Sequence, residues 1–257
     1  MFLHKHPYEP FIQSDTEKLI VGTLPPPRFS TGDLLEKDVD FCYGSYYNSL
    51  WLFIDKIHKL NLRYDNSQAA IDERKEFLIQ HKIGVCDIVN SCEREKIDAS
   101  DLGMTNIQLR DVVDYLLKFP SIHTILFTGG NSKNGPEYFF RKHLKEYNLK
   151  LEVVSDEIPR IHQFDLSQAE NLHLNDVNER SRSATSHKEL SHRACHIERS
   201  RDAVEMQSRC IKTVSLTSAS GAANRAIGSI PLYRKLKREN PKFTTFDFRV
   251  LQYKAFF

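Results

Sequence analysis

The sequence predicts an α/β fold: a three-layer sandwich in which a mostly parallel central sheet is flanked by helices. Short apolar runs, typical of buried strands, alternate along the chain with segments of helical periodicity. Such alternation is typical of a parallel sheet with helices packed on it. The chain has 257 residues, of which 40% are hydrophobic and 11% aromatic, so it can bury one sizeable core. We therefore expect a single domain over residues 1–257.

The elements are predicted from apolar periodicity and from Gly and Pro at their ends. Residues 19–21 form a continuous apolar run, and Leu50, Ile54 and Ile57 lie on one stripe of a helix. Pro120 ends another helix. In chain order we expect a strand over 18–23, helices over 47–60 and 68–81, a strand over 83–89, a helix over 106–119, a strand over 124–128, a helix over 137–147, and strands over 149–154 and 213–216.

The composition changes between residues 167 and 212. This segment has no aromatic residue, Gly or Pro, and it carries eight basic and seven acidic residues. It also repeats itself, since ERSRSA at 179–184 returns as ERSRDA at 198–203. Such a segment cannot bury enough apolar area to offset its ordering entropy. We expect 167–212 to be a disordered, repeat-derived insertion.

Composition also bears on location and on bound groups. No apolar run approaches the roughly 20 residues that span a bilayer, and the N-terminal residues lack the apolar region of a signal peptide, so we expect a cytoplasmic protein with no membrane partner.

The five cysteines form no CxxC pair, which argues against a disulfide framework. One group of residues invites a zinc site: His187, His192, Cys195, His196 and Cys210. No pair among them has finger-like spacing, and we expect neither metal nor cofactor.

Basic residues gather near the C-terminus, although the net charge of the whole chain is only +2. From residue 221 onward eight Lys and Arg face two acidic residues, with aromatic residues between them. A basic segment close to a pocket can follow the phosphates of a nucleic acid. A solvated helix face followed by an amphipathic strand is an equally good interpretation.

Two loops leave predicted strands and are candidates for one site. The first contains Gly22, Thr23, Leu24 and Pro25, and the second runs from residue 217 to 225. In open α/β sheets, ligand sites form at the carboxyl ends of strands, so we expect both loops to face one crevice. Backbone amides and hydroxyl groups of the second loop can hold a phosphate, although most such loops merely cap a helix. The candidate phosphate contacts there are Ser218, Ser220, Gly221, Asn224 and Arg225.

Three further residues are candidates for the pocket itself. Tyr43 can stack on a flat ring, and otherwise it is a half-buried tyrosine whose hydroxyl reaches water. Asn48 can bind the edge of a base, although Asn at the start of a helix is more often a cap. Asp87 can polarise water, but the favoured interpretation is a buried carboxylate that pairs with Arg94 or caps a loop.

Four segments in the same order resemble the motifs of one family. Residues 22–25 resemble a Gly-x-[Asp/Asn]-Pro loop, and 43–51 resemble an aromatic segment with a central Asn and a final Trp. Residues 84–94 resemble Gly-x-Trp-Asp-Val-x-x-Ser-Cys-x-Arg, and 218–225 resemble a DNA-contacting Ser loop. Together they resemble the uracil-DNA glycosylase superfamily, with most likeness to its deoxyinosine (hypoxanthine) and mismatch-specific branches. The resemblance covers 18–237 without the insertion.

The resemblance implies a monomeric DNA repair enzyme that hydrolyses the N-glycosidic bond of a flipped deaminated base, uracil or hypoxanthine, without a cofactor. It assigns catalysis to Asn48, with Asp87 as a second polar candidate, and base binding to residues 22–25, Tyr43 and Asn48. Leu24 stands where most branches place the Asp or Asn that orients water, and leucine cannot do so. The alternatives are a catalytically impaired nucleic-acid-binding module with the same pocket, and a domain that binds a free nucleotide.

Overall fold

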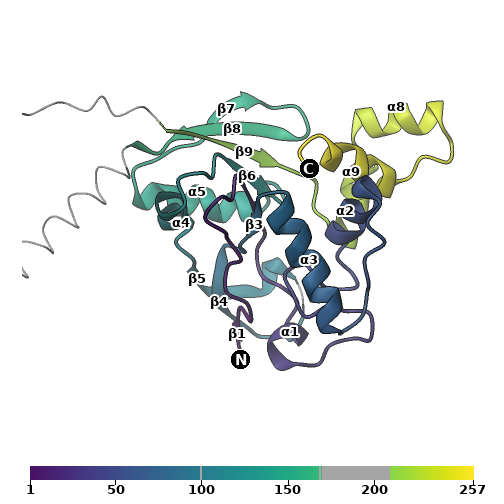
Figure 1. Ribbon diagram of the computed structural model, residues 1–257. Coiled ribbons are helices and arrows are strands. Elements are labelled where there is room, and N and C mark those ends of the chain that lie inside the picture. Colours follow the sequence, from purple (N-terminus) through teal and green to yellow (C-terminus); the bar gives the residue numbers. More distant parts are fainter. Residues whose placement is uncertain (99, 168, 170–208) are drawn as a thin grey trace, which may run out of the picture.

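The computed structural model describes residues 1–98, 100–167, 169 and 209–257, and it contains the predicted central sheet (Figure 1). Six strands lie in the order β3-β2-β6-β9-β8-β7. Four of them are parallel: β2 (Lys18–Val21), β3 (Ile83–Val85), β6 (Thr124–Phe127) and β9 (Cys210–Ser215). Two antiparallel strands extend the sheet beyond β9: β8 (Arg160–Asp165) and β7 (Glu152–Ser155). The expectation of a mostly parallel α/β sheet is confirmed.

The sheet is buried on both faces, which is why β2 and β6 consist almost wholly of apolar residues. Leu19, Val21 and Ile125 belong to one core cluster, whereas Ile20 and Leu126 belong to a second one. Because successive side chains of a strand point to opposite faces, these two clusters are the two sides of the same sheet. Ile20 and Leu126 are paired neighbours in the register of β2 and β6.

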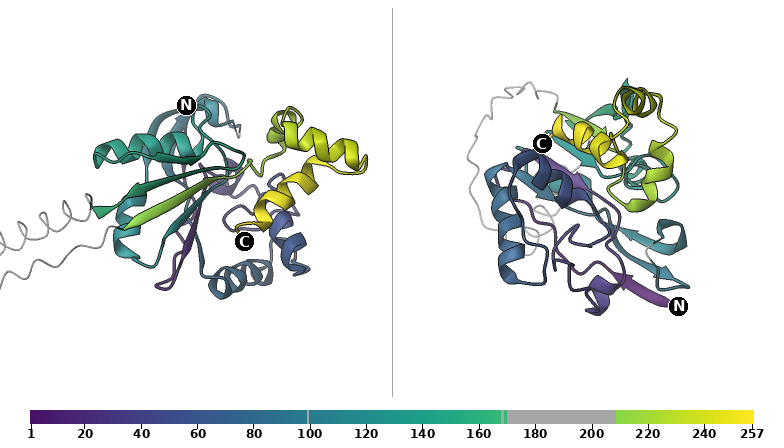
Figure 2. Two further views of the ribbon diagram at one scale, coloured as in Figure 1. Left: turned by 90° about the horizontal axis from the view of Figure 1, so that it is seen from above. Right: turned by 90° about the vertical axis from the view of Figure 1, so that its right-hand side faces the viewer.

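Helices cover each face of the sheet, so the molecule has the predicted three layers (Figure 2). One face packs against α4 (Val112–Lys118) and α5 (Pro136–Glu146) through apolar residues such as Val113 and Phe140. The other face packs against α2 (Leu50–His58), α3 (Gln68–Gln80) and α9 (Thr245–Lys254). Short helices complete the described chain: α1 (Arg28–Thr31), η1 (Asp101–Gly103), η2 (Gly221–Ala223), α7 (Asn224–Ile227) and α8 (Pro231–Glu239). None of the described helices is long and apolar enough to cross a bilayer.

A second, antiparallel sheet corrects two of the predicted elements. It consists of β1 (Phe2–Lys5), β4 (Val89–Arg94) and β5 (Met104–Leu109) in the order β1-β4-β5. The strand predicted over 83–89 is therefore two strands in different sheets, and the helix predicted over 106–119 begins only at Val112. Residues 106–109 pair with β4 instead, because tertiary strand pairing overrides a helical pattern of a few residues.

The predicted insertion leaves the sheet at the junction of β8 and β9. Most of 167–212 lies outside the described residues, together with His187, His192, Cys195 and His196 of the zinc hypothesis. Its last three residues, 210–212, belong to β9 and pair with β8. On the other side of the junction, the Leu166 amide donates a hydrogen bond of 2.9 Å to the Arg209 carbonyl. The two ends of the insertion therefore lie side by side.

Candidate functional site

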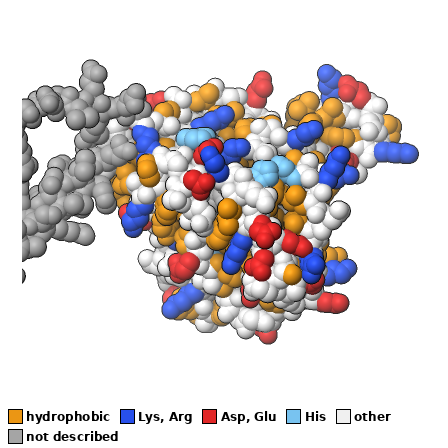
Figure 3. All heavy atoms as spheres, in the orientation of Figure 1, with side chains coloured by type: hydrophobic (Ala, Val, Ile, Leu, Met, Phe, Trp, Pro, Cys, Tyr) orange, Lys and Arg blue, Asp and Glu red, His pale blue; other side chains and the backbone are white. Residues whose placement is uncertain are grey.

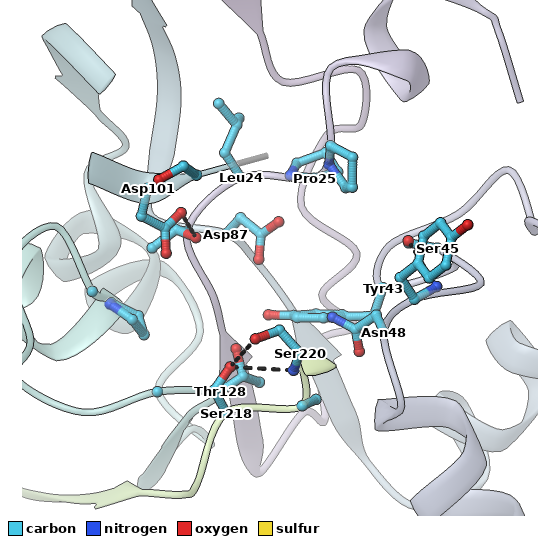
Figure 4. A pocket seen from close by; sticks show the side chains of 18 of the residues that line it. Leu24, Pro25, Tyr43, Ser45, Asn48, Asp87, Asp101, Thr128, Ser218 and Ser220 are labelled. Carbon is cyan, nitrogen blue, oxygen red and sulfur yellow. Dashed lines mark hydrogen bonds between the residues drawn. The ribbon is translucent and has the colours of Figure 1, made fainter. Parts of the chain in front are cut away.

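A cavity of about 400 Å³ opens at the carboxyl ends of β2, β6 and β9. Both loops named from the sequence line it, since Leu24 and Pro25 lie on one side and Ser218 and Ser220 on another (Figure 4). Thr23 also belongs to the lining. The Ser49 amide donates a 2.9 Å hydrogen bond to the Ala219 carbonyl, which joins the second loop to the start of α2. The expected crevice between the two loops is therefore present.

The cavity contains the carboxylate of Asp87, which is only 5% exposed. One of its oxygens accepts a 3.1 Å hydrogen bond from the Gly22 amide, and the other accepts a 3.0 Å hydrogen bond from His6 Nε2. The Tyr8 amide donates to His6 Nδ1 at 3.1 Å. Nδ1 is therefore the unprotonated nitrogen, and Nε2 carries the hydrogen that His6 donates to Asp87.

The environment of Asp87 keeps this buried group ionised. Burial alone would raise its pKa, but the hydrogen bond from His6, the Tyr43 hydroxyl and the charge of Arg110 together hold the pKa below its usual value. The favoured interpretation from the sequence is confirmed in part, because Asp87 is a buried carboxylate that accepts a hydrogen bond from the Gly22 amide of a loop, but its pairing with Arg94 is wrong. Arg94 donates to His4 Nδ1 at 2.9 Å and to the Ser100 carbonyl at 2.7 Å.

Tyr43 forms the wall next to Asp87 and is 9% exposed, so it is more deeply buried than a tyrosine whose hydroxyl reaches bulk water. Its hydroxyl points toward Asp87 and makes no hydrogen bond of good geometry with any described residue (Figure 4). Burial and the neighbouring Asp87 carboxylate raise the pKa of Tyr43 well above its usual value, so the hydroxyl stays protonated. The Tyr43 hydroxyl is therefore a protonated donor directed at the Asp87 carboxylate.

Gly22 allows these groups to converge. A Cβ atom at this position would lie 2.6 Å from Asp87 Oδ1, 2.7 Å from the Tyr43 hydroxyl and 3.0 Å from Thr128 Oγ1. Real Cβ atoms do not approach polar atoms so closely. Glycine is needed here because three polar side chains meet at its Cα.

Asn48 lies just before the start of α2 and also faces the cavity. Its Oδ1 accepts a 2.9 Å hydrogen bond from the Leu50 amide, the first of α2, from the position before the N-cap residue Ser49. Its backbone forms an isolated bridge with Ser220. No described residue accepts a hydrogen bond from its Nδ2, so the amide can still donate to a ligand. Leu24 adds only an apolar surface and packs against the core of one face.

Asp101 is a second carboxyl group of the cavity, and sequence reasoning missed both it and His6. Thr23 Oγ1 donates a 3.0 Å hydrogen bond to Asp101 Oδ1. Burial, assisted by the charge of Asp87, raises the pKa of Asp101 to about 6, against opposing effects of Thr23 and Arg94. Asp101 lies in a loop after β4 that carries no local motif, and His6 follows β1. Neither has a spacing that a sequence pattern would detect.

The second loop is held from behind by Arg249 of α9, which is 3% exposed. Its guanidinium donates to the carbonyls of Ser218 and Ser220 at 3.2 and 3.1 Å, and to Asn224 Oδ1 at 2.8 Å. Asn224 therefore uses its side-chain oxygen within the fold. Among the candidate phosphate contacts, Ser218 and Ser220 line the cavity, whereas Gly221, Asn224 and Arg225 lie outside its lining.

The basic C-terminal segment forms η2, α7, α8 and α9 and no strand within the described residues 221–257, unlike the helix and strand of the alternative interpretation. Its aromatic residues hold α8 and α9 together, since the Tyr233 ring lies 5.7 Å from that of Phe248 and 6.2 Å from that of Phe243. Basic side chains lie on the exposed surface of α8 (Figure 3). Among the described residues no cluster of His, Cys, Asp and Glu has the arrangement of a metal site.

Comparisons with known proteins add a distant likeness to solved structures. No family model matches the chain, and no curated protein matches it. One solved structure is the solution NMR structure of a "putative Uracil DNA glycosylase" from Methanosarcina acetivorans. It is 14% identical in sequence, the match covers 96% of this chain and 99% of that one, and the TM-score is 0.44. At this identity and TM-score the likeness carries no conclusion about family or activity.

Proposed function

We propose that the chain is a monofunctional DNA glycosylase that hydrolyses the N-glycosidic bond of a flipped deaminated base, uracil or hypoxanthine. The observation that carries this proposal is the ionised Asp87 carboxylate, held by His6 inside a cavity that Tyr43 walls. Small-molecule sites have volumes of about 300–1,000 Å³, and this cavity, at about 400 Å³, falls in that range.

The chemistry needs a negative charge beside the sugar. When the bond from C1′ to the base nitrogen breaks, its electron pair leaves with the base and the sugar acquires oxocarbenium character. A fixed carboxylate in a site of low dielectric stabilises that positive charge. Water then adds its oxygen to C1′, and its proton balances the charge of the released base. Asp87 is placed to accept a hydrogen bond from that water.

In this proposal Asp87 supplies the hydrogen-bond acceptor for water that Leu24 lacks. Leucine in the first loop cannot orient water, but the Asp87 carboxylate bonds to the Gly22 amide, two residues before Leu24. It therefore brings an acceptor to the same strand end from another part of the chain. The Asn48 amide supplies a donor for the base, since no described residue accepts from Asn48 Nδ2, and the Tyr43 ring supplies a surface for stacking.

The test is a cleavage assay on single- and double-stranded oligonucleotides that carry one uracil or hypoxanthine, followed by alkali. We expect strand cleavage by the wild type and its loss in Asn48→Ala. Glu76→Gln, on the exposed side of α3, is the control and should cleave normally. Failure to release either base from either substrate would overturn the proposal.

The second candidate is a binding module without activity, which the hydrogen bond from the Leu50 amide to Asn48 Oδ1 favours. It predicts selective binding of oligonucleotides that contain uracil or hypoxanthine, with no cleavage after long incubation. An Asn48→Ala variant would then lose helix stability of about 1 kcal/mol and change affinity little.

A further inference from the structure

We propose that Asp101 is the catalytic acid of this site, the group that gives a proton to a departing purine base. The inference rests on the proposed glycosylase function and deepens it. Asp101 and Asp87 line the same cavity but come from different segments, η1 and the link between β3 and β4. They differ in their hydrogen-bond partners, and therefore in the work that each can do.

The two carboxyl groups are prepared for opposite roles. Asp87 accepts two hydrogen bonds and stays ionised, whereas Asp101 accepts one hydroxyl hydrogen bond, from Thr23. Oδ2 of Asp101 makes no hydrogen bond with a described residue. Burial raises the pKa of Asp101 to about 6, while the pKa of Asp87 is lowered. Two titratable groups whose environments separate their pKa values are the usual basis of an acid and base pair.

The position of Asp101 is fixed by two neighbouring loops. Asn134 Nδ2, from the loop after β6, donates a 2.9 Å hydrogen bond to the Asp101 carbonyl. Arg94 donates to the Ser100 carbonyl at 2.7 Å. The charged and titratable groups around Asp101 are Arg94, Asp98, Cys92 and Asp87. Of these, Arg94 lowers the pKa of Asp101 and Asp87 raises it.

The protonated Asp101 carboxyl gives its proton to a ring nitrogen of the purine as the C1′–N9 bond breaks, and the bonding electron pair leaves with the base. Water supplies the new oxygen at C1′ and loses a proton to solvent, from which Asp101 is protonated again. A purine leaves poorly as an anion, so it gains most from the acid. Uracil leaves more readily as an anion and gains little.

The test compares Asp101→Asn with the wild type on hypoxanthine and uracil substrates. The Asn side chain still accepts from Thr23 and can bind a base, but it cannot release a proton. General acids contribute about 10²–10⁴-fold, so at pH 6 we expect kcat on hypoxanthine to fall by about 100-fold with KM nearly unchanged. Excision of uracil should change less than about threefold. Wild-type activity on hypoxanthine should decline above pH 6, and the variant should lack that decline.

The matched control is Glu95→Gln, an exposed carboxylate just after β4 that forms no hydrogen bond or ion pair with a described residue. It should keep both activities. Equal losses on the two substrates in Asp101→Asn, or an unchanged pH profile, would overturn the role of Asp101.

A binding measurement separates this inference from the proposed function. We expect free hypoxanthine to bind the wild type about tenfold more tightly at pH 5 than at pH 8, a difference of about 1.4 kcal/mol, and Asp101→Asn to bind equally at both. If no base is excised but this pH dependence is present, the glycosylase proposal and the catalytic role of Asp101 both fail, and Asp101 is a base-binding residue only; if uracil is excised but the pH dependence is absent, only the inference about Asp101 fails. If neither is observed, both fail.

Discussion

His6 and Asp87 are 81 residues apart in the chain and are joined by a 3.0 Å hydrogen bond beside the cavity. The His6 side chain is 1% exposed and Asp87 is 5% exposed, so solvent does not compete for this bond. Because the Tyr8 amide occupies Nδ1, His6 can only donate to Asp87 through Nε2. The pair therefore links the N-terminal segment beyond β1 to the charge that the proposed reaction uses.

The first prediction concerns this pair. His6→Phe keeps a ring but removes the donor, so burial will dominate and the pKa of Asp87 will rise. We expect lower excision at neutral pH, and an acidic limit of the pH–rate profile that moves toward neutral pH. His123→Gln, an exposed histidine, is the control. An unchanged pH–rate profile in His6→Phe would show that His6 does not hold the charge of Asp87.

The same pair makes a prediction about stability. The pKa of Asp87 is lower in the folded chain than in the unfolded one. Its contribution to the free energy of unfolding is therefore present above the ordinary pKa of Asp, about 3.9, and is lost as the pH falls through the folded value. We expect His6→Phe to cost about 1.5–3 kcal/mol at pH 7. The difference from the wild type should shrink at low pH, as urea unfolding at pH 3 and pH 7 will measure.

Gly22→Ala tests the convergence of side chains at the end of β2. The new methyl group would lie 2.6 Å from Asp87 Oδ1 and 2.7 Å from the Tyr43 hydroxyl, so one of them must move. We expect a loss of about 1–3 kcal/mol in stability and loss of base binding. Gly221→Ala is the matched control, because a Cβ there meets nothing within 4 Å. Equal melting temperatures for the two variants would contradict the crowding argument.

An element of the fold could be predicted from the sequence where the local residue pattern reflects the interaction that determines its structure. The apolar run of β2 predicts a strand because both faces of the sheet are covered. The loops after Thr23 and Leu216 meet because parallel strands bring their carboxyl ends to one edge. The local pattern of residues 106–109 predicts a helix, because it does not show their pairing with β4. That pairing depends on residues 12 or more positions earlier in the chain. His6 and Asp101 also reach the cavity through contacts between residues far apart in the chain, so no residue spacing in the sequence predicts them.

The exposed basic residues of α8 lead to a prediction about DNA affinity. Lys235 and Arg238 are exposed on this helix, and no described residue forms a hydrogen bond or ion pair with them. If they bind phosphates, the double variant Lys235→Gln, Arg238→Gln will weaken binding to undamaged duplex. The slope of log K against log salt should fall by about 1.8, since each phosphate contact contributes about 0.9. Lys142→Gln with Lys145→Gln, on α5, is the control. An unchanged slope in the first variant would remove α8 from the DNA-binding surface.

The junction of β8 and β9 makes the last prediction. Asp165 pairs with Cys210 in the antiparallel register, and the Leu166 amide donates to the Arg209 carbonyl, so the two strands are already joined as in a hairpin. Replacing residues 170–208 by a four-residue Gly/Ser linker halves the length of the connection about three times. Each halving lowers the entropic cost of closing the loop by about 0.6 kcal/mol. The shortened chain should unfold cooperatively and be up to about 2 kcal/mol more stable.

A Gly/Ser segment of full length in place of 170–208 is the control for this deletion. If the natural residues contribute no contacts, the control will match the wild type in melting temperature while the shortened chain exceeds both. A control less stable than the wild type, or a shortened chain that unfolds without cooperativity, would show that the inserted residues stabilise the fold. The hypothesis of a dispensable insertion would then be wrong, because loop entropy alone favours the shorter connection.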